Sequence, residues 1–167
     1  MDKIYFKIIE YLISICISKR YTEKEIEIKI DQIILKKYSN IDFERENIDL
    51  FSLKIRLFNR LKELKYINDY QYAIDYINEK SRIRLKGKNL IRMELKRKGL
   101  DDEIIYKAVE NSNYNENAVL KMSFEKNKGK WSKLSDVKAR EKIYRYFIGR
   151  GFNAENIYKL MNSYYSK

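Results

Sequence analysis

The chain of 167 residues contains no histidine, no proline and a single cysteine, Cys16. One cysteine cannot form a disulfide within the chain, and the absence of partner cysteines excludes a cysteine-based metal site. The absence of histidine excludes histidine-ligated metals, the Ser-His-Asp triad and Cys-His catalysis. No two carboxylates are placed together by the pattern of the chain as a general acid and base would require. We therefore expect no catalytic residue, no metal site and no cofactor, and a protein that is not an enzyme.

Residues that form turns are scarce, because there are only five glycines and no proline. Strand-rich folds need more of both between their strands, so this balance favours helices. The composition of 44% apolar and 36% charged residues is that of a folding sequence rather than a disordered one. We predict an all-α protein.

The most apolar stretch covers residues 4–17, but it is too short to span a bilayer, and Lys7 and Glu10 interrupt it. It also lacks the small-residue cleavage site of a secretory signal. We interpret it as a first, buried helix. The expected protein is cytoplasmic and has no membrane partner.

The net charge of +12 lies entirely in the second half of the chain. Residues 1–79 are neutral overall, residues 80–98 carry +8, residues 99–120 carry −4 and residues 121–150 carry +7. Two basic blocks separated by an acidic one predict a patterned surface that attracts nucleic acid or a polyanionic assembly. The alternative is that these charges only solvate helix faces and keep the protein soluble.

The second half contains an internal repeat, since residues 90–109 and 142–161 align with an offset of 52 residues. Each copy has a helix that ends in a basic residue and a glycine, at Lys98-Gly99 and at Arg150-Gly151. Glycine adopts the left-handed conformation that closes a helix, and a preceding cation suits the negative helix end. Asp101 and Asn153 then stand at the N-cap position of the next helix.

A helix also precedes each copy, starting near Asn68 or Asp69 and near Asn115. The residues expected on its inner face are Ala73, Ile74 and Ile77 in the first case and Ala118, Val119 and Met122 in the second. The inner faces of the last helices are predicted to be Ile104, Ile105, Ala108 and Val109, and Ile157, Leu160, Met161 and Tyr164.

The N-terminal half reads as a degenerate first copy. Thr22 to Glu25 form a capping-box pattern, Ile26 and Ile30 follow at helical spacing, and Leu53, Leu57, Leu61 and Leu64 mark a third helix. We predict three tandem three-helix repeats at residues 1–66, 67–112 and 113–167. An insertion or helix extension near residues 36–50 distinguishes the first.

Basic residues gather at the corner after the first helix of the second and third repeats and on the helices that follow. Lys88, Arg92 and Lys96 share one helix face, at steps of four residues. The candidate partner- or DNA-binding residues are Arg82, Arg84, Lys86, Lys88, Arg92, Lys96, Lys126, Lys128, Lys130, Lys133, Arg140 and Arg145.

Two other groups of residues invite a functional interpretation. Trp131 is suited to stacking on a base or filling a partner's pocket, but packing over a helix junction is the commoner role and the one we predict. Asp69, Asp101 and Asp102 are assigned to helix capping rather than to catalysis.

Three segments carry a resemblance to the RecX family of recombination regulators. They are Tyr66-Ile67-Asn68-Asp69 followed by Tyr72-Ala73, then Gly87-x-x-x-Ile91-Arg92-x-Glu94-Leu95-x-x-Lys98-Gly99, and finally Arg150-Gly151-Phe152. The likeness is clear over about residues 60–165 and weak over residues 5–60, where residues 36–50 depart from the family.

The resemblance implies an elongated, curved, right-handed array of three-helix units that binds, as a monomer, in the groove of the RecA filament on single-stranded DNA. It further implies that the protein limits strand exchange, ATP hydrolysis and the co-protease function of the SOS response. Whether it inhibits or only tunes RecA, and whether it also binds single- or double-stranded DNA directly, stays open.

Two rival functions remain. A helical nucleic-acid-binding protein acting without RecA would use the Lys98-Gly99 or Arg150-Gly151 turn in a helix-turn-helix manner. A hydrolase or nuclease would need a carboxylate-only metal site, which the sequence does not indicate.

Overall fold

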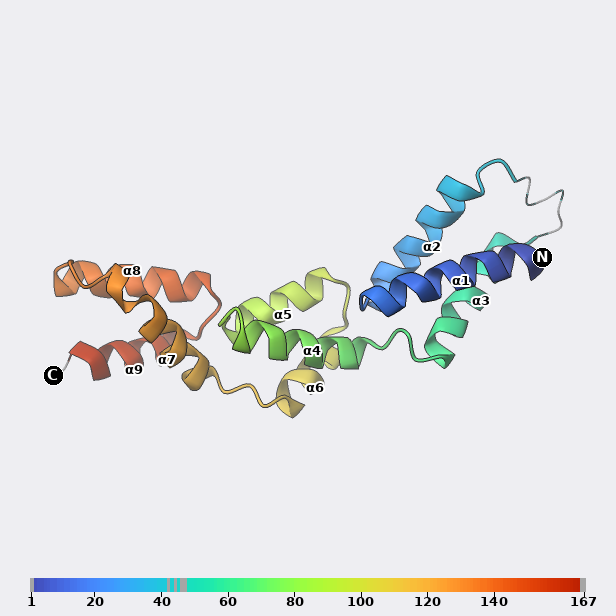
Figure 1. The fold of residues 1–167 in the computed structure, drawn as a ribbon. Coiled ribbons are helices and arrows are strands. Elements are labelled where there is room, and N and C mark those ends of the chain that lie inside the picture. The colour runs from blue at the N-terminus through green and yellow to red at the C-terminus, as the bar shows by residue number, and fades with distance from the viewer. Residues whose placement is uncertain (1, 42, 44, 46–47, 166–167) are drawn as a thin grey trace. The chain divides into compact units, whose positions relative to one another are not determined.

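A computed structural model describes residues 2–41, 43, 45 and 48–165 (Figure 1). Within these residues the chain forms nine α-helices and one short 3₁₀ helix, and it forms no strand. The prediction of an all-α fold built from helical repeats is confirmed. Over the same residues, no helix combines the length and the apolar character needed to cross a membrane.

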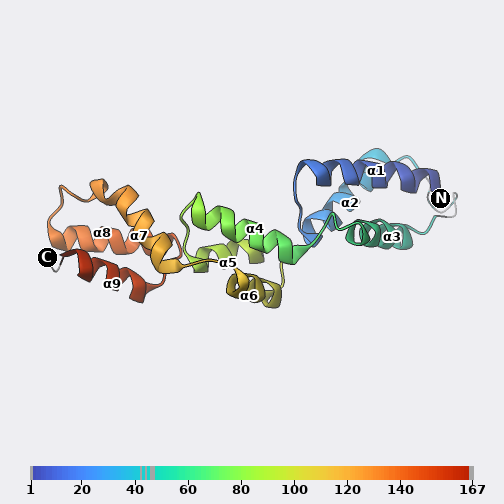
Figure 2. The same cartoon turned by 60° about the horizontal axis from the view of Figure 1, so that its bottom comes forward.

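The helices belong to two compact units. Unit 1 consists of the residues up to Tyr72 together with Lys98–Asp101, and unit 2 consists of Ala73–Arg97 and Asp102 onwards. Unit 1 contains α1 (Asp2–Ser18), α2 (Glu23–Lys37) and α3 (Leu50–Glu63), together with the first turn of α4 (Asp69–Arg82). Unit 2 contains the rest of α4, α5 (Lys88–Arg97), α6 (Asp102–Asn111), α7 (Glu116–Asn127), η1 (Lys128–Lys130), α8 (Asp136–Gly149) and α9 (Ala154–Tyr165) (Figures 1 and 2).

The core of unit 1 comes from one apolar face on each of its three helices. The predicted first helix is α1, and its Ile8 and Leu12 are fully buried. They pack in one cluster with Ile26, Ile30, Leu53, Leu57 and Leu61. Leu64 is an exception to the predicted leucine stripe, because α3 ends at Glu63 and Leu64 is 39% exposed at its C-cap.

The connection between α2 and α3 covers most of the predicted insertion. Helix α2 continues to Lys37, and α3 begins after Asp49, whose carboxylate accepts hydrogen bonds from the amides of Phe51 (3.0 Å) and Ser52 (3.3 Å). Ile48 is buried in the unit 1 core. Residues 42, 44, 46 and 47 of the predicted insertion lie outside the described residues.

The three predicted asparagine caps are present where the sequence places them, whereas the predicted cap Asp101 forms no side-chain hydrogen bond among the described residues. Asn68, Asn115 and Asn153 accept hydrogen bonds from the amides of Gln71 (2.9 Å), Ala118 (3.0 Å) and Glu155 (2.8 Å). The glycines of both basic-glycine turns have left-handed backbones, with φ of +88° at Gly99 and +81° at Gly151. These local patterns therefore set the helix boundaries.

The core of unit 2 differs from prediction along α7. The buried side chains of this helix include Leu120, Ser123 and Phe124, whereas Met122 is 57% exposed. Ala118 is exposed too. Val119 is buried as predicted, but the prediction was wrong for Ala118 and Met122, because the neighbouring face carries Leu120 and Phe124, which bury more apolar surface than these two would.

Trp131 packs inside unit 2, as predicted. It is 7% exposed, stacks on Phe124 with ring centroids 6.0 Å apart, and meets Tyr146 edge-on at 5.5 Å. Tyr164 was predicted to face inward, yet it is 47% exposed, and its ring forms a T-shaped pair with that of Phe124, with centroids 4.8 Å apart.

Candidate partner-binding surface

The segment 82–88 between α4 and α5, which we call the basic elbow, is a fixed turn. Its centre is Leu85, which has a left-handed backbone (φ +49°) and is nevertheless 7% exposed, packed in the unit 2 core. The next amide, of Lys86, donates to the carbonyl of Lys80 at 3.0 Å. A non-glycine residue with positive φ costs free energy and persists only where the surroundings hold it.

The turn after α8 holds the elbow in place. The amide of Gly87 donates to the carbonyl of Arg150 at 2.8 Å, and the amide of Asn89 donates to that of Gly151 at 3.0 Å. The guanidinium of Arg150 also donates to the carbonyls of Arg84 and Leu85. The sequence predicted Arg150 only as a cation at a helix end. Its role in holding the elbow depends on contacts with residues about 65 positions away in the chain, which the sequence pattern does not reveal.

The approach of the two backbones requires glycine on both sides. A Cβ atom on Gly87 would collide with the backbone of Gly151 and Phe152, and a Cβ on Gly151 would collide with Leu90. The elbow is further fixed by Tyr114, whose hydroxyl donates to the carbonyl of Lys86 at 3.1 Å. Burial raises the pKa of the Tyr114 hydroxyl above its ordinary value.

Two cations of the elbow are available for a partner. Arg82 and Arg84 are exposed and form no ion pair with any described residue. By contrast, Lys86 pairs with Glu94, and the ammonium group of Lys88 lies 3.4 Å from Glu110. The elbow thus presents two unpaired guanidinium groups on a backbone that is already ordered.

The face of α5 is less basic than its sequence indicates. The predicted stripe of Lys88, Arg92 and Lys96 does follow one helix face, but Lys96 lies 2.7 Å from Asp102 and Lys88 is paired as above. Arg92 is half-buried and lines a hollow of about 470 Å³ together with Met93, Lys96, Asp102, Ile105 and Tyr106. The acids that neutralise the stripe lie on α6, and the spacing within α5 could not identify them.

The second group of predicted cations surrounds the end of α7. Lys126, Lys128, Lys130 and Lys133 are all exposed, and Lys128 lies 2.6 Å from Glu125. The ammonium group of Lys130 lies 5.2 Å from the centre of the Tyr146 ring. On α8, Arg145 pairs with Glu141, while Arg140 bonds Asn162 at 3.2 Å and covers the Tyr165 ring. Of this set, Lys126 and Lys133 have neither an ion pair nor a ring contact among the described residues.

The Lys98-Gly99 turn makes matching contacts inside unit 1. The carbonyl of Lys98 accepts from the hydroxyl of Thr22 at 2.9 Å, and the ammonium group of Lys98 lies 2.7 Å from Glu25. Thr22 and Glu25 at the same time form the predicted capping box of α2. The turn is therefore tied to the first residues of α2, as the Arg150-Gly151 turn is tied to the first residues of α5.

A carboxylate completes each of these two contacts. Asp69, which is 7% exposed, accepts from the amide of Glu23 at 2.8 Å, and Glu116 accepts from the amide of Lys88 at 3.2 Å. Burial raises the pKa of Asp69, against the lowering effect of that hydrogen bond. Asp69 was predicted to cap a helix, and it does so for α2 rather than for its own helix. Asp102 instead pairs with Lys96.

The described residues contain no group of three or more cysteine, aspartate or glutamate side chains placed to hold a metal ion. The features that the structure does assemble are a rigid elbow, unpaired arginines and open hollows between helices. Unpaired cations on an ordered backbone favour contact with a partner of complementary charge.

Comparison with known proteins relates the chain to one family. A family model described as "RecX, second three-helix domain" matches residues 68–109. The regulatory protein RecX of Actinobacillus pleuropneumoniae serotype 5b is 26% identical over 158 residues, which are 95% of this chain and 93% of that one. The regulatory protein RecX of Clostridium perfringens strain SM101 is 31% identical over 141 residues, 82% of this chain and 59% of the relative. The crystal structure of RecX from Lactobacillus salivarius superposes with a TM-score of 0.76 at 21% identity, covering 98% of this chain and 97% of that one.

Proposed function

The chain belongs to the RecX family of regulatory proteins, and from this membership we propose that it binds the RecA filament on single-stranded DNA and inhibits or modulates RecA. The activities affected are strand exchange, ATP hydrolysis and the SOS co-protease function. The protein acts as a regulator and not as an enzyme. The family relationship is the observation that carries the proposal.

The basic elbow supports a binding role. Arg82 and Arg84 are exposed, and their backbone is held by Leu85, Gly87 and Arg150 before any partner arrives. A preordered cationic turn loses little conformational entropy on binding, and arginine is suited to bidentate contacts with carboxylates and phosphates. We propose that these two arginines contact acidic groups of RecA, phosphates of the enclosed strand, or both.

The other predicted cations contribute in a graded way. Lys126 and Lys133 resemble the elbow arginines in being exposed and unpaired among the described residues. The remaining candidates, Lys86, Lys88, Arg92, Lys96, Lys128, Lys130, Arg140 and Arg145, mostly have carboxylate or ring partners in the protein. A cation that already has a partner gains less from a new one, so we propose that the unpaired cations carry most of the binding.

The alternative function, direct nucleic-acid binding without RecA, is favoured by the net charge of +12. The two functions are separated by measuring binding to bare single-stranded DNA, bare duplex and RecA-coated single-stranded DNA, each at several salt concentrations. RecA regulation predicts the tightest binding to the coated strand. Tighter binding to bare DNA, with a steep salt slope, would replace the proposal by the alternative.

The same experiment tests the elbow. We expect the double variant R82A/R84A to lower affinity for RecA-coated DNA by about tenfold or more, because two charged contacts are lost. The matched control is K7A/K36A, which removes the same charge from exposed positions of unit 1. Equal affinity of the two double variants would show that total charge matters and the elbow does not.

A further inference from the structure

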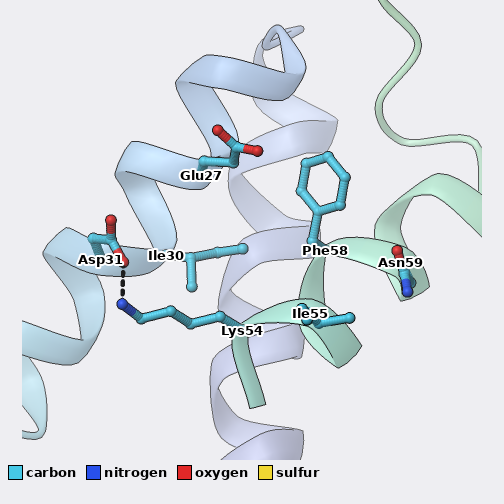
Figure 3. Close-up of a pocket in the computed structure, with 7 residues that line it drawn as sticks. All are labelled: Glu27, Ile30, Asp31, Lys54, Ile55, Phe58 and Asn59. Carbon is cyan, nitrogen blue, oxygen red and sulfur yellow. Dashed lines mark ion pairs between the residues drawn. The ribbon is translucent and has the colours of Figure 1, made fainter. Parts of the chain in front are cut away.

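A hollow of about 310 Å³ lies between α2 and α3 in unit 1 (Figure 3). Glu27 and Asp31 project from α2 on one side, and Ile55 and Phe58 come from α3 on the other, with Ile30 between them. Its full lining is Glu27, Ile30, Asp31, Lys54, Ile55, Phe58 and Asn59. Pockets for small apolar groups begin at about this volume, roughly 300 Å³.

The apolar side chains at the hollow are accessible from outside, since Ile55 is 43% exposed and Phe58 is half-buried. An exposed apolar surface beside acidic groups is typical of an interaction site.

The charge of the hollow is set by Glu27. Asp31 is already paired, since its carboxylate lies 2.6 Å from the ammonium group of Lys54 (Figure 3). Glu27 pairs with Lys24 at 4.0 Å, but both side chains are more than half exposed, and Lys24 is not part of the lining. The lining itself therefore carries two carboxylates and one ammonium group, a surplus of one negative charge at an apolar hollow.

Unit 2 has a hollow in the equivalent position with the opposite charge. Glu27 and Asp31 follow Thr22 by five and nine residues, and Arg92 and Lys96 follow Gly87 by the same steps. Thr22 and Gly87 are equivalent because each precedes its helix and each bonds a basic-glycine turn. In unit 2 Lys96 is paired with Asp102, so Arg92 is the surplus charge. The two hollows share a construction and differ in sign.

We propose that the α2–α3 hollow of unit 1 binds a protein segment that inserts an apolar side chain and carries a lysine or arginine beside it. The apolar side chain would pack on Ile30, Ile55 and Phe58, and the cation would pair with Glu27. Apolar contact supplies affinity in such grooves, and charge complementarity selects the partner. This site is separate from the elbow of unit 2, and it does not depend on RecA binding.

The test uses two synthetic helical peptides that have the same leucines and differ only in flanking residues, lysine in one and glutamate in the other. Anisotropy of a dye on each peptide is measured against the full chain at low salt, where charge effects are largest. We expect saturable binding of the lysine peptide and weaker binding of the glutamate peptide. The net charge of +12 would produce the opposite preference by non-specific attraction.

Charge reversal at Glu27 locates the site. Glu27→Lys should lower the affinity for the lysine peptide about tenfold and raise the affinity for the glutamate peptide. For the lysine peptide, a like-charge contact replaces an attractive one. Glu10→Lys, an identical change on the exposed face of α1, should leave both affinities within about twofold. Failure of the lysine peptide to saturate, or equal effects of the two variants, would overturn the proposal. Neither peptide involves RecA or DNA, so this outcome is independent of the proposed function.

Discussion

The two basic-glycine turns make equivalent contacts through different groups. At Lys98-Gly99, side chains make the contact, because the hydroxyl of Thr22 bonds the turn and Glu25 pairs with Lys98. At Arg150-Gly151, the main chain makes it, because the amides of residues 87 and 89 bond the turn directly. The backbones approach so closely there that two glycines face each other.

The difference shows where substitution is tolerated. A contact made by side chains can rearrange when one member changes, whereas a contact between two backbones has no adjustable part. The turn of unit 2 also carries the elbow with its unpaired arginines. We infer that the rigid contact lies where the proposed binding residues must be positioned, and that the adaptable one lies where only stability is required.

The largest expected effect is from Gly151→Ala, which adds a Cβ against Leu90 at a residue with φ +81°. Steric overlap and the left-handed backbone together should lower the free energy of unfolding by about 3 kcal/mol or more. Gly99→Ala adds a Cβ 2.5 Å from the Cβ of Lys24, and so meets the root of a side chain rather than main-chain atoms, and a smaller loss of about 2 kcal/mol is expected. Urea denaturation followed by circular dichroism measures both, and equal losses would contradict the distinction between the turns.

Thr22→Val should follow in size. It removes the hydroxyl that bonds both the Lys98 carbonyl and the Glu25 amide, at a residue that is fully buried. We expect a loss of about 2 kcal/mol, because a cap and a buried tertiary hydrogen bond are lost together. Asn115→Ala removes a cap of α7 alone and should cost about 1 kcal/mol in the same denaturation experiment. If Thr22→Val lowers the free energy of unfolding by no more than Asn115→Ala does, the hydrogen bond from the Thr22 hydroxyl to Lys98 does not stabilise the fold.

The stability of unit 1 should depend on pH through the titration of the Asp69 carboxyl group. Since burial raises its folded pKa, the folded state holds a proton more readily than the unfolded chain does. The contribution of protonated Asp69 to stability is complete below its pKa in the unfolded chain, about 3.9. This contribution is lost as pH rises through the higher pKa of Asp69 in the folded protein. Wild type should therefore gain stability relative to Asp69→Asn as pH falls from neutrality. Denaturation curves of both proteins at matched pH values test this, and parallel pH profiles would exclude it.

The smallest expected change is from Glu25→Gln, which removes the charge that pairs with Lys98. Both side chains are just over one-quarter exposed, so about 0.5–1 kcal/mol is expected, and less at high salt. Glu103→Gln breaks the exposed pair with Lys107 and should produce no measurable change. A loss at Glu25 that is insensitive to salt would mean that hydrogen bonding, and not charge, holds the turn.

Local features of the fold could be predicted from the sequence, because they depend on neighbours in the chain. The caps at Asn68, Asn115 and Thr22 and the left-handed glycines are of this kind. The inner face of α7 could not be predicted, since Met122 and Phe124 offer competing helical faces and packing with other helices selects one.

The candidate surface was only partly predictable for the same reason. The pattern located the cations, but their partners Glu94, Glu110 and Asp102 depend on how α5 meets its neighbours. The left-handed Leu85 carries no local pattern, and it exists because Arg150 and the core hold it. Which charges remain unpaired is a property of the packed helices rather than of the sequence alone.

The central claim, that the rigid elbow regulates RecA, is tested most directly by RecA's single-stranded-DNA-dependent ATP hydrolysis. The protein is titrated from far below RecA up to an equal concentration, in parallel with R82A/R84A and K7A/K36A. We predict that wild type and K7A/K36A change the hydrolysis rate at substoichiometric amounts, and that R82A/R84A needs about tenfold more protein. No effect of folded wild-type protein at equal concentration, with RecA of the same source, would contradict the proposed function. Equal potency of all three proteins would contradict the role of the elbow.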